Sequence, residues 1–200
     1  MKRTILIYLL LFIMFSISAQ RIELISGDPA LFKQANAYYL TFEYTDLKVG
    51  NYGDEQAYID YMKDDAEKRK SGSSESWLKK WNDDRVDFYQ PKFIELFNIN
   101  LNYKNVKGDT LLNNQQYEVN LHTNFIEPGF NRNAKRSPAL IDVMVTISKI
   151  SDTGKKLVIS MTGVPGVEVM GSYYPDHRRI AEAYAKCGKE LAKYLSKVVY

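Results

Sequence analysis

The chain has 200 residues, of which 45% are hydrophobic and 26% charged, and its formal net charge at pH 7 is +3. So small a charge gives no reason to expect binding of nucleic acid or electrostatic attachment to a membrane. The sole cysteine, Cys187, can form no disulfide within the chain, so the fold must depend on a hydrophobic core.

The N-terminal segment has the order that is typical of a secretory signal peptide. Lys2 and Arg3 precede an apolar run at 5–15, and small residues follow up to Ala19. The run is shorter than the roughly 20 apolar residues of an ordinary membrane span, although an uncleaved N-terminal anchor is the alternative. No cysteine near the expected cleavage site offers a lipid anchor. We therefore predict a signal peptide at 1–19, export to the periplasm or the cell exterior, and one α/β domain at 20–200 with no transmembrane span after cleavage.

The first half of this domain predicts strands followed by helices. Alternation of apolar and polar residues predicts strands, whereas charged stretches with a narrow apolar stripe predict helices. We predict a possible strand at 21–25, a strand at 38–44 and helices at 54–70 and 75–89.

The second of these helices carries two tryptophans at helical spacing, Trp77 and Trp81. Such a pair fits a core-facing stripe, the commoner case, or a platform on which a sugar stacks. Pro91 either ends this helix or begins a further turn as far as Phe97. The Asn-rich stretch 98–116 then predicts a long surface loop, with a short edge strand at 101–106.

Three runs of alternating residues occupy the centre of the chain, at 117–125, 139–147 and 157–161. Each run places one apolar set, including Phe125 in the first and Ile141 in the second, on one face of a strand. Their connections are short enough for consecutive antiparallel strands. We therefore predict a three-stranded antiparallel meander.

The last predicted element is a helix from Asp176 to about Val198, with an apolar stripe that includes Cys187. A strand that is joined to the meander through helices should lie parallel to it. The sequence thus predicts a two-layer α/β sandwich, in which a mixed sheet holds the meander and helices pack on one face. We expect Phe93 and Ile141 in its core.

The catalytic chemistry open to this chain is narrow, because it has two histidines and no metal-binding, phosphate-binding or nucleophile motif. We predict no metal and no cofactor. The strongest catalytic combination is Glu43, His122 and Asp142, which alternation places on the polar face of the sheet. If their strands adjoin, a carboxylate could orient His122 as a general base. The alternative is that all three are ordinary solvated positions.

The connection 127–138 between the first two meander strands is longer than a tight hairpin requires. It combines one aromatic residue with three cations: Phe130, Arg132, Lys135 and Arg136. Such a loop on a rigid scaffold could bind an acidic protein surface, a lipid phosphate or an anionic glycan. The alternative is a solvated loop that binds nothing.

Four stretches resemble a family of uncharacterised secreted bacterial proteins: WLKKWNDDRVDFYQPKFIELFN, NFIEPGFNRNAKRSPALIDV, MTGVPGVEVMG and RRIAEAYAKCGKELAKYL. The order of elements is also similar to the N-terminal domain of TolB and to LpoB-type envelope lipoproteins. That resemblance implies a non-catalytic module that binds another envelope protein, without the lipid anchor of the lipoproteins. We therefore expect a secreted or periplasmic binding module, with a small secreted hydrolase as the alternative. The sequence leaves the ligand and the oligomeric state open.

Overall fold

The computed structural model describes residues 20–132, 135–166 and 176–200, with the side chains of 131, 132, 135 and 136 outside the description. The predicted signal peptide at 1–19 therefore lies outside the described residues. Within these ranges, no helix combines the length and the apolar composition that crossing a membrane requires.

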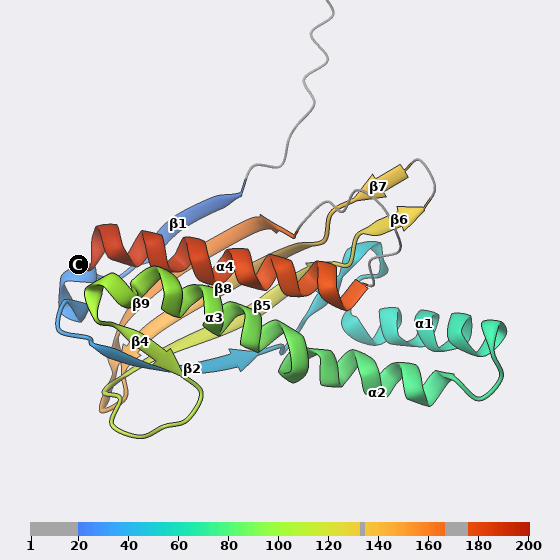
Figure 1. Ribbon diagram of the computed structural model, residues 1–200, viewed down its shortest axis with the longest axis horizontal. Helices are drawn as coiled ribbons and strands as arrows, with labels where there is room; N and C mark the ends of the chain where they lie inside the picture. Colours follow the sequence, from blue (N-terminus) through green and yellow to red (C-terminus); the bar gives the residue numbers. More distant parts are fainter. Residues whose placement is uncertain (1–19, 133–134, 167–175) are drawn as a thin grey trace, which may run out of the picture.

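A mixed open sheet of seven strands forms one layer of the molecule (Figure 1). The strand order is β1-β9-β8-β5-β2-β4, and the short β3 also pairs with β5. β5, β8 and β9 form the predicted antiparallel meander, and β2 lies parallel to β5. The strands are β1 (Arg21–Ser26), β2 (Ala37–Glu43), β3 (Lys48–Val49), β4 (Lys107–Asp109), β5 (Tyr117–Glu127), β8 (Leu140–Lys149) and β9 (Asp152–Pro165).

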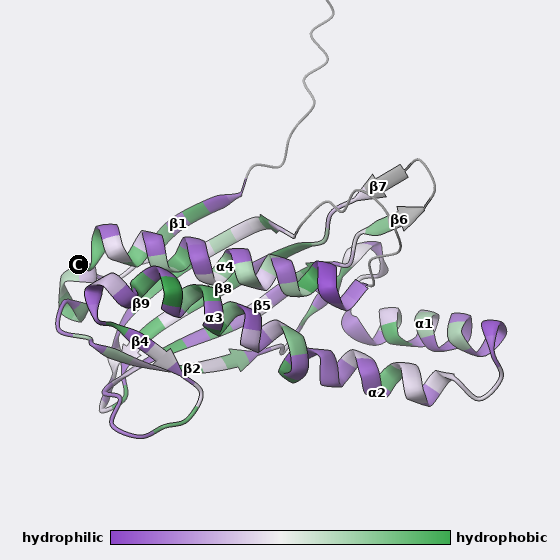
Figure 2. Cartoon of the chain, in the orientation of Figure 1, coloured by the Kyte–Doolittle hydropathy of each residue, from purple (hydrophilic) through white to green (hydrophobic). Residues whose placement is uncertain are grey.

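Helices α3 and α4 lie side by side across one face of this sheet and form the second layer (Figure 1). The predicted two-layer α/β sandwich is therefore confirmed. Figure 2 shows hydrophilic and hydrophobic residues alternating along α4, as an amphipathic helix on a sheet requires. The helices are α1 (Glu55–Arg69), α2 (Ser74–Asp84), α3 (Gln90–Leu101) and α4 (Asp176–Val198), with 3-10 turns at Pro29–Phe32, Gly50–Tyr52 and Asn102–Lys104.

The other two helices depart from the prediction that helices cover one face of the sheet. α1 and α2 form a helical hairpin that extends beyond one end of the sheet (Figure 1). The reason lies in their narrow apolar stripes, because Tyr58 is the only buried residue of α1 and Trp81 the only buried apolar residue of α2. These rings bury each other across the hairpin rather than against the strands.

α2 and α3 form one continuous helical rod, joined by a π turn at Arg85–Tyr89. The N–H of Gln90 donates to the carbonyl oxygen of Arg85, five residues back, which inserts one extra residue into the helical turn. Pro91 lies just after this turn, near the start of α3. Pro91 therefore does not end the helix, and the helical segment continues beyond it as far as Leu101.

The predicted loop at 98–116 is shorter than expected, and the predicted edge strand at 101–106 is misplaced. α3 continues to Leu101, and the edge strand is β4, at Lys107–Asp109. The Asn98 side chain explains the position, because it accepts from the N–H of Gly108 (2.7 Å) and donates to its carbonyl oxygen (2.9 Å). A Cβ at Gly108 would lie 2.7 Å from Leu40, so only glycine lets β4 approach this closely.

The core lies between the sheet and the α3–α4 layer. Phe93 and Ile141 are both fully buried there, as predicted. At Gly188 of α4 an added Cβ would lie 2.3 Å from the carbonyl oxygen of Phe93, so the two helices touch backbone to backbone. Cys187, beside it, is buried, and burial raises the pKa of its thiol. The thiol is therefore a packing group rather than a nucleophile.

One predicted core position is wrong. The alternation along 117–125 placed Phe125 on the apolar face, but Ile126 is fully buried instead. The cause is an irregularity in the pairing of β5 with β8 between Thr123 and Phe125, which reverses the alternation. Thr123 faces the core, and its hydroxyl forms a 2.7 Å hydrogen bond with the hydroxyl of Tyr184 in α4.

Candidate functional site

The connection at 127–138 contains a small two-stranded antiparallel ribbon rather than the irregular loop that its polarity suggested. β6 (Phe130–Arg132) pairs with β7 (Lys135–Ser137) and forms a sheet of its own. This β6–β7 ribbon projects past the same end of the main sheet as the α1–α2 hairpin (Figure 1). Phe130 exposes 44% of its surface, whereas the side chains of Arg132, Lys135 and Arg136 lie outside the described residues.

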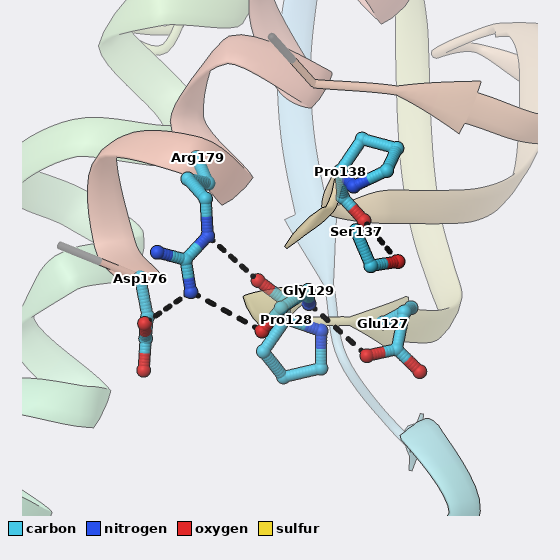
Figure 3. A network of polar contacts seen from close by, with 7 residues as sticks. All are labelled: Glu127, Pro128, Gly129, Ser137, Pro138, Asp176 and Arg179. Carbon is cyan, nitrogen blue, oxygen red and sulfur yellow. Dashed lines mark hydrogen bonds and ion pairs between the residues drawn. The ribbon is translucent and has the colours of Figure 1, made fainter. Parts of the chain in front are cut away.

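The base of the ribbon is fixed to α4 by the buried guanidinium of Arg179 (Figure 3). Its Nε donates to the carbonyl oxygen of Pro128 and its Nη2 to that of Gly129, each at 3.2 Å. The same nitrogen forms an ion pair with Asp176 at the start of α4. A buried cation with this many partners holds the turn between β5 and β6 in one place.

The turn itself requires glycine. Gly129 has φ +66°, and a Cβ at this position would lie 2.5 Å from the carbonyl oxygen of Ser137 on the returning strand. The N–H of Gly129 donates to the carboxylate of Glu127 at 3.0 Å (Figure 3). Glu127 is thus engaged in the turn.

The three residues of the polar sheet face make separate contacts. Glu43 and His122 are paired across β2 and β5. Glu43 accepts from the Thr45 hydroxyl at 2.6 Å, while Nε2 of His122 lies 2.7 Å from the Thr45 carbonyl oxygen and so donates to it. Asp142 accepts from the N–H of Gly163 at 2.6 Å. Within the described chain, no hydrogen bond joins His122 to either carboxylate; its ring is held by the Thr45 carbonyl oxygen and lies near the amide of Asn124.

A metal site is equally unsupported in the part of the chain that the structure describes. No three His, Cys, Asp or Glu side chains among these residues approach closely enough to hold an ion.

A cavity of about 170 Å³ lies between the α1–α2 hairpin and the first turn of α4. One part of its wall is aromatic and the rest is largely charged. In the aromatic part the rings of Trp77 and Trp81 are stacked, with centroids 6.0 Å apart and planes 9° apart. Tyr58 of α1 packs against Trp81 with a centroid distance of 5.0 Å. The indole N–H of Trp81 donates to Glu55 at 2.5 Å, which fixes the ring. The wall is therefore held in place before any ligand arrives.

Two polar side chains in the lining of this cavity are buried without a hydrogen-bond partner among the described residues. The hydroxyl of Tyr89 is one, on a residue that is 1% exposed. Asp84, a residue that is 6% exposed, is the other: its carboxyl group forms no hydrogen bond among the described residues, although its oxygens are not sealed from solvent as the Tyr89 hydroxyl is. Burial raises the pKa of Asp84 to about 6 and that of Tyr89 well above its usual range. Buried polar groups normally have partners, so these two groups make the cavity a candidate binding site.

Sequence reasoning identified the tryptophans of this cavity but missed Asp84 and Tyr89. The two tryptophans stood out by composition and spacing. Asp84 looked like one more charge in an exposed stretch, and Tyr89 looked like the end of a helix. Only the π turn brings Tyr89 to the same cavity as Asp84.

Comparisons with protein-family models, with curated proteins and with solved structures found no significant match to this chain. The function must therefore be argued from the residues themselves.

Proposed function

We propose that this protein is an exported, non-catalytic binding module of the cell envelope, and that the β6–β7 ribbon is its contact surface for an acidic partner protein. The observation that carries the proposal is the ribbon's position: it stands outside the main sheet, with its base fixed to α4 by Arg179. Because its base is already held in place, the ribbon has less conformational entropy to lose when a partner binds it.

The composition of the ribbon suits a charged partner surface. Arg132, Lys135 and Arg136 lie within five positions of one another, and Glu127, the nearest acid, is already bonded to Gly129. Arginine can grip a carboxylate with two parallel hydrogen bonds, and lysine adds a point charge. Phe130 supplies an exposed aromatic group of the kind that anchors interfaces.

The contacts on the sheet's polar face support a binding role over hydrolysis. The alternative function needs His122 to be oriented by Glu43 or Asp142. Their described hydrogen bonds run instead to Thr45 and Gly163, as structural polar groups do.

Capture of partner proteins from envelope extracts at low and high salt tests the proposal. Arg132, Lys135 and Arg136 are replaced together by Ser, and recovery is compared with that of wild type. We expect recovery by wild type to fall with salt, because screening shortens electrostatic interactions to about 10 Å at 0.1 M. The triple variant should recover at least severalfold less at low salt, with an unchanged melting temperature.

A matched control removes three cations elsewhere. Lys186, Lys189 and Lys197 are exposed on the outer side of α4, and their joint replacement by Gln changes the net charge equally. This variant should capture the partner as wild type does. Equal capture by the ribbon variant and wild type at low salt would reject the ribbon as the contact surface.

A further inference from the structure

We propose that the cavity between α1, α2 and the start of α4 binds a small primary alkylammonium ion, which Asp84 and Tyr89 hold by hydrogen bonds and the tryptophans enclose. This second site is independent of the β6–β7 ribbon and of its partner.

The first argument is the pair of unpartnered groups. A buried carboxylate with no partner is costly, and so is a buried hydroxyl. Asp84 and Tyr89 both line the same cavity. A primary ammonium group has three donors and no acceptor. It can donate to the carboxylate of Asp84 and to the phenolic oxygen of Tyr89 at once, and it leaves no polar atom of its own that needs a donor from the protein.

The second argument is the aromatic wall. A cation is attracted to the face of an aromatic ring, and tryptophan attracts it most strongly. Trp81 and Tyr58 are buried, and Trp77 is half-buried. Because Glu55 and the neighbouring rings hold Trp81, the wall need not be ordered on binding. Aromatic faces next to a carboxylate favour a cation over an anion.

The third argument is the charge that remains after internal pairing. Asp65 in the lining forms an ion pair with Arg69 at 2.5 Å, and Asp176 pairs with Arg179. Lys80 is exposed and forms no ion pair among the described residues. Asp84 is thus the buried charge of the lining that has no ion-pair partner; burial raises its pKa, and the positive charge of Lys80, which also lines the cavity, lowers it by less. The charged or titratable groups around it are Asp65 and Arg69 from α1, Lys80 and Asp83 from α2, Asp87 from the π turn, and Asp176 and His177 from α4.

The size of the cavity suits a small ligand. Its volume of about 170 Å³ is close to the roughly 150 Å³ of an apolar cavity that holds benzene, which has six non-hydrogen atoms. n-Butylammonium has about five non-hydrogen atoms, whereas a hexose has about twelve. A short amine therefore fits inside the cavity, whereas a sugar stacked on Trp77 and Trp81 would extend beyond it.

Tryptophan fluorescence can test this proposal directly, because Trp77 and Trp81 are the chain's only two tryptophans. The protein is titrated with n-butylammonium chloride at pH 7.5 against equal concentrations of sodium chloride, and calorimetry measures the affinity. We expect a saturable change in emission. Tetramethylammonium, which has the charge but no N–H donor, should bind at least several times more weakly.

Two variants assign the binding to the proposed groups. Asp84→Asn should weaken butylammonium binding by about tenfold or more, and Tyr89→Phe by a few fold, since each removes one hydrogen bond to the ligand. Asp83→Asn is the matched control, because Asp83 is the neighbouring residue, lies outside the cavity lining and pairs with Lys79. It should bind as wild type does. Thermal melts establish that each variant is folded.

The pH dependence gives a readout that a merely structural role for Asp84 would not produce. With a pKa of about 6, Asp84 is about one-tenth ionised at pH 5 and almost fully ionised at pH 7.5, so affinity should fall roughly tenfold at the lower pH. Burial lowers the pKa of His177, whose protonation at low pH would also repel a cation. The variant His177→Gln should retain the loss of affinity, which separates the two groups.

Several outcomes would overturn the proposal. No saturable change up to about 50 mM amine would mean an affinity too weak for a built site. Undiminished binding by Asp84→Asn would place the amine elsewhere. Tighter binding of N-acetylglucosamine than of butylammonium would identify a sugar site instead.

Discussion

The two ends of this molecule bury their side chains in opposite ways. Where α3 and α4 cover the sheet, Phe93 and Ile141 are fully buried and the backbones touch at Gly188. Where α1 and α2 meet the start of α4, Asp84 and Tyr89 are buried without partners beside a cavity. A close-packed region contributes stability, whereas polar groups left unsatisfied reduce stability and suit the binding of a ligand. The contrast is in keeping with our proposal that the second end binds a ligand while the first holds the fold together.

The largest expected effect comes from creating voids at the close-packed end. Phe93→Ala and Ile141→Ala should each lower the free energy of unfolding by about 2–5 kcal/mol, the usual cost of truncating a large buried side chain. Met62→Ala, on a partly buried residue in the cavity lining, should cost well under half of that. Urea unfolding of the three variants measures the contrast. Equal losses at both ends would show that the two regions are packed alike.

A smaller effect separates two stacked tyrosines, Tyr89 and Tyr184, whose ring centroids lie 5.2 Å apart. Tyr184→Phe leaves the buried hydroxyl of Thr123 without its partner and should cost about 1–3 kcal/mol. Tyr89→Phe removes a hydroxyl that has no partner and should be neutral or slightly stabilising. Thermal unfolding of both variants provides the measurement. A clear loss on Tyr89→Phe would reveal a partner for its hydroxyl.

The smallest effect is a gain in stability. Burial raises the pKa of Asp84 from 3.8 to about 6, so between these values the folded protein binds a proton that the unfolded chain has released. Stability therefore falls as pH rises through this window, and the cost persists at higher pH. We expect Asp84→Asn to be about 1–2 kcal/mol more stable than wild type at pH 7.5, a value reduced for partial solvation through the cavity, and no more stable near pH 3.5. Unfolding curves at the two pH values test this, and a loss at pH 7.5 would contradict it.

The sequence predicted the sheet well because its alternating runs are long and strongly patterned. The meander, the parallel β2 and the limits of α4 are where the residues placed them. Errors arose where a single contact outweighs a pattern. The irregularity after Thr123 buries Ile126 in place of Phe125, and the two hydrogen bonds from Asn98 fix β4.

The candidate sites were predictable only in part. The cations of the ribbon could be read from composition, but Arg179, which fixes the base of the ribbon, lies more than 40 residues later in the chain. The cavity needs three segments that meet only in the folded protein. Its decisive residue, Asp84, is one of three aspartates between Asn82 and Phe88 that look alike in the sequence. Burial distinguishes it, and no local pattern predicts that burial.

The π turn at Arg85–Tyr89 also sets the rotational phase between the two ends of the molecule. Each residue of an α-helix advances the chain by about 100° around the axis. Removing one residue from this turn would restore the α-helical repeat and rotate α2, with α1, by about that angle relative to α3. Trp81 would then swing away from the start of α4, while α3 and its contacts with the sheet could stay as they are. The single extra residue thus determines the direction in which the α1–α2 hairpin points relative to α3.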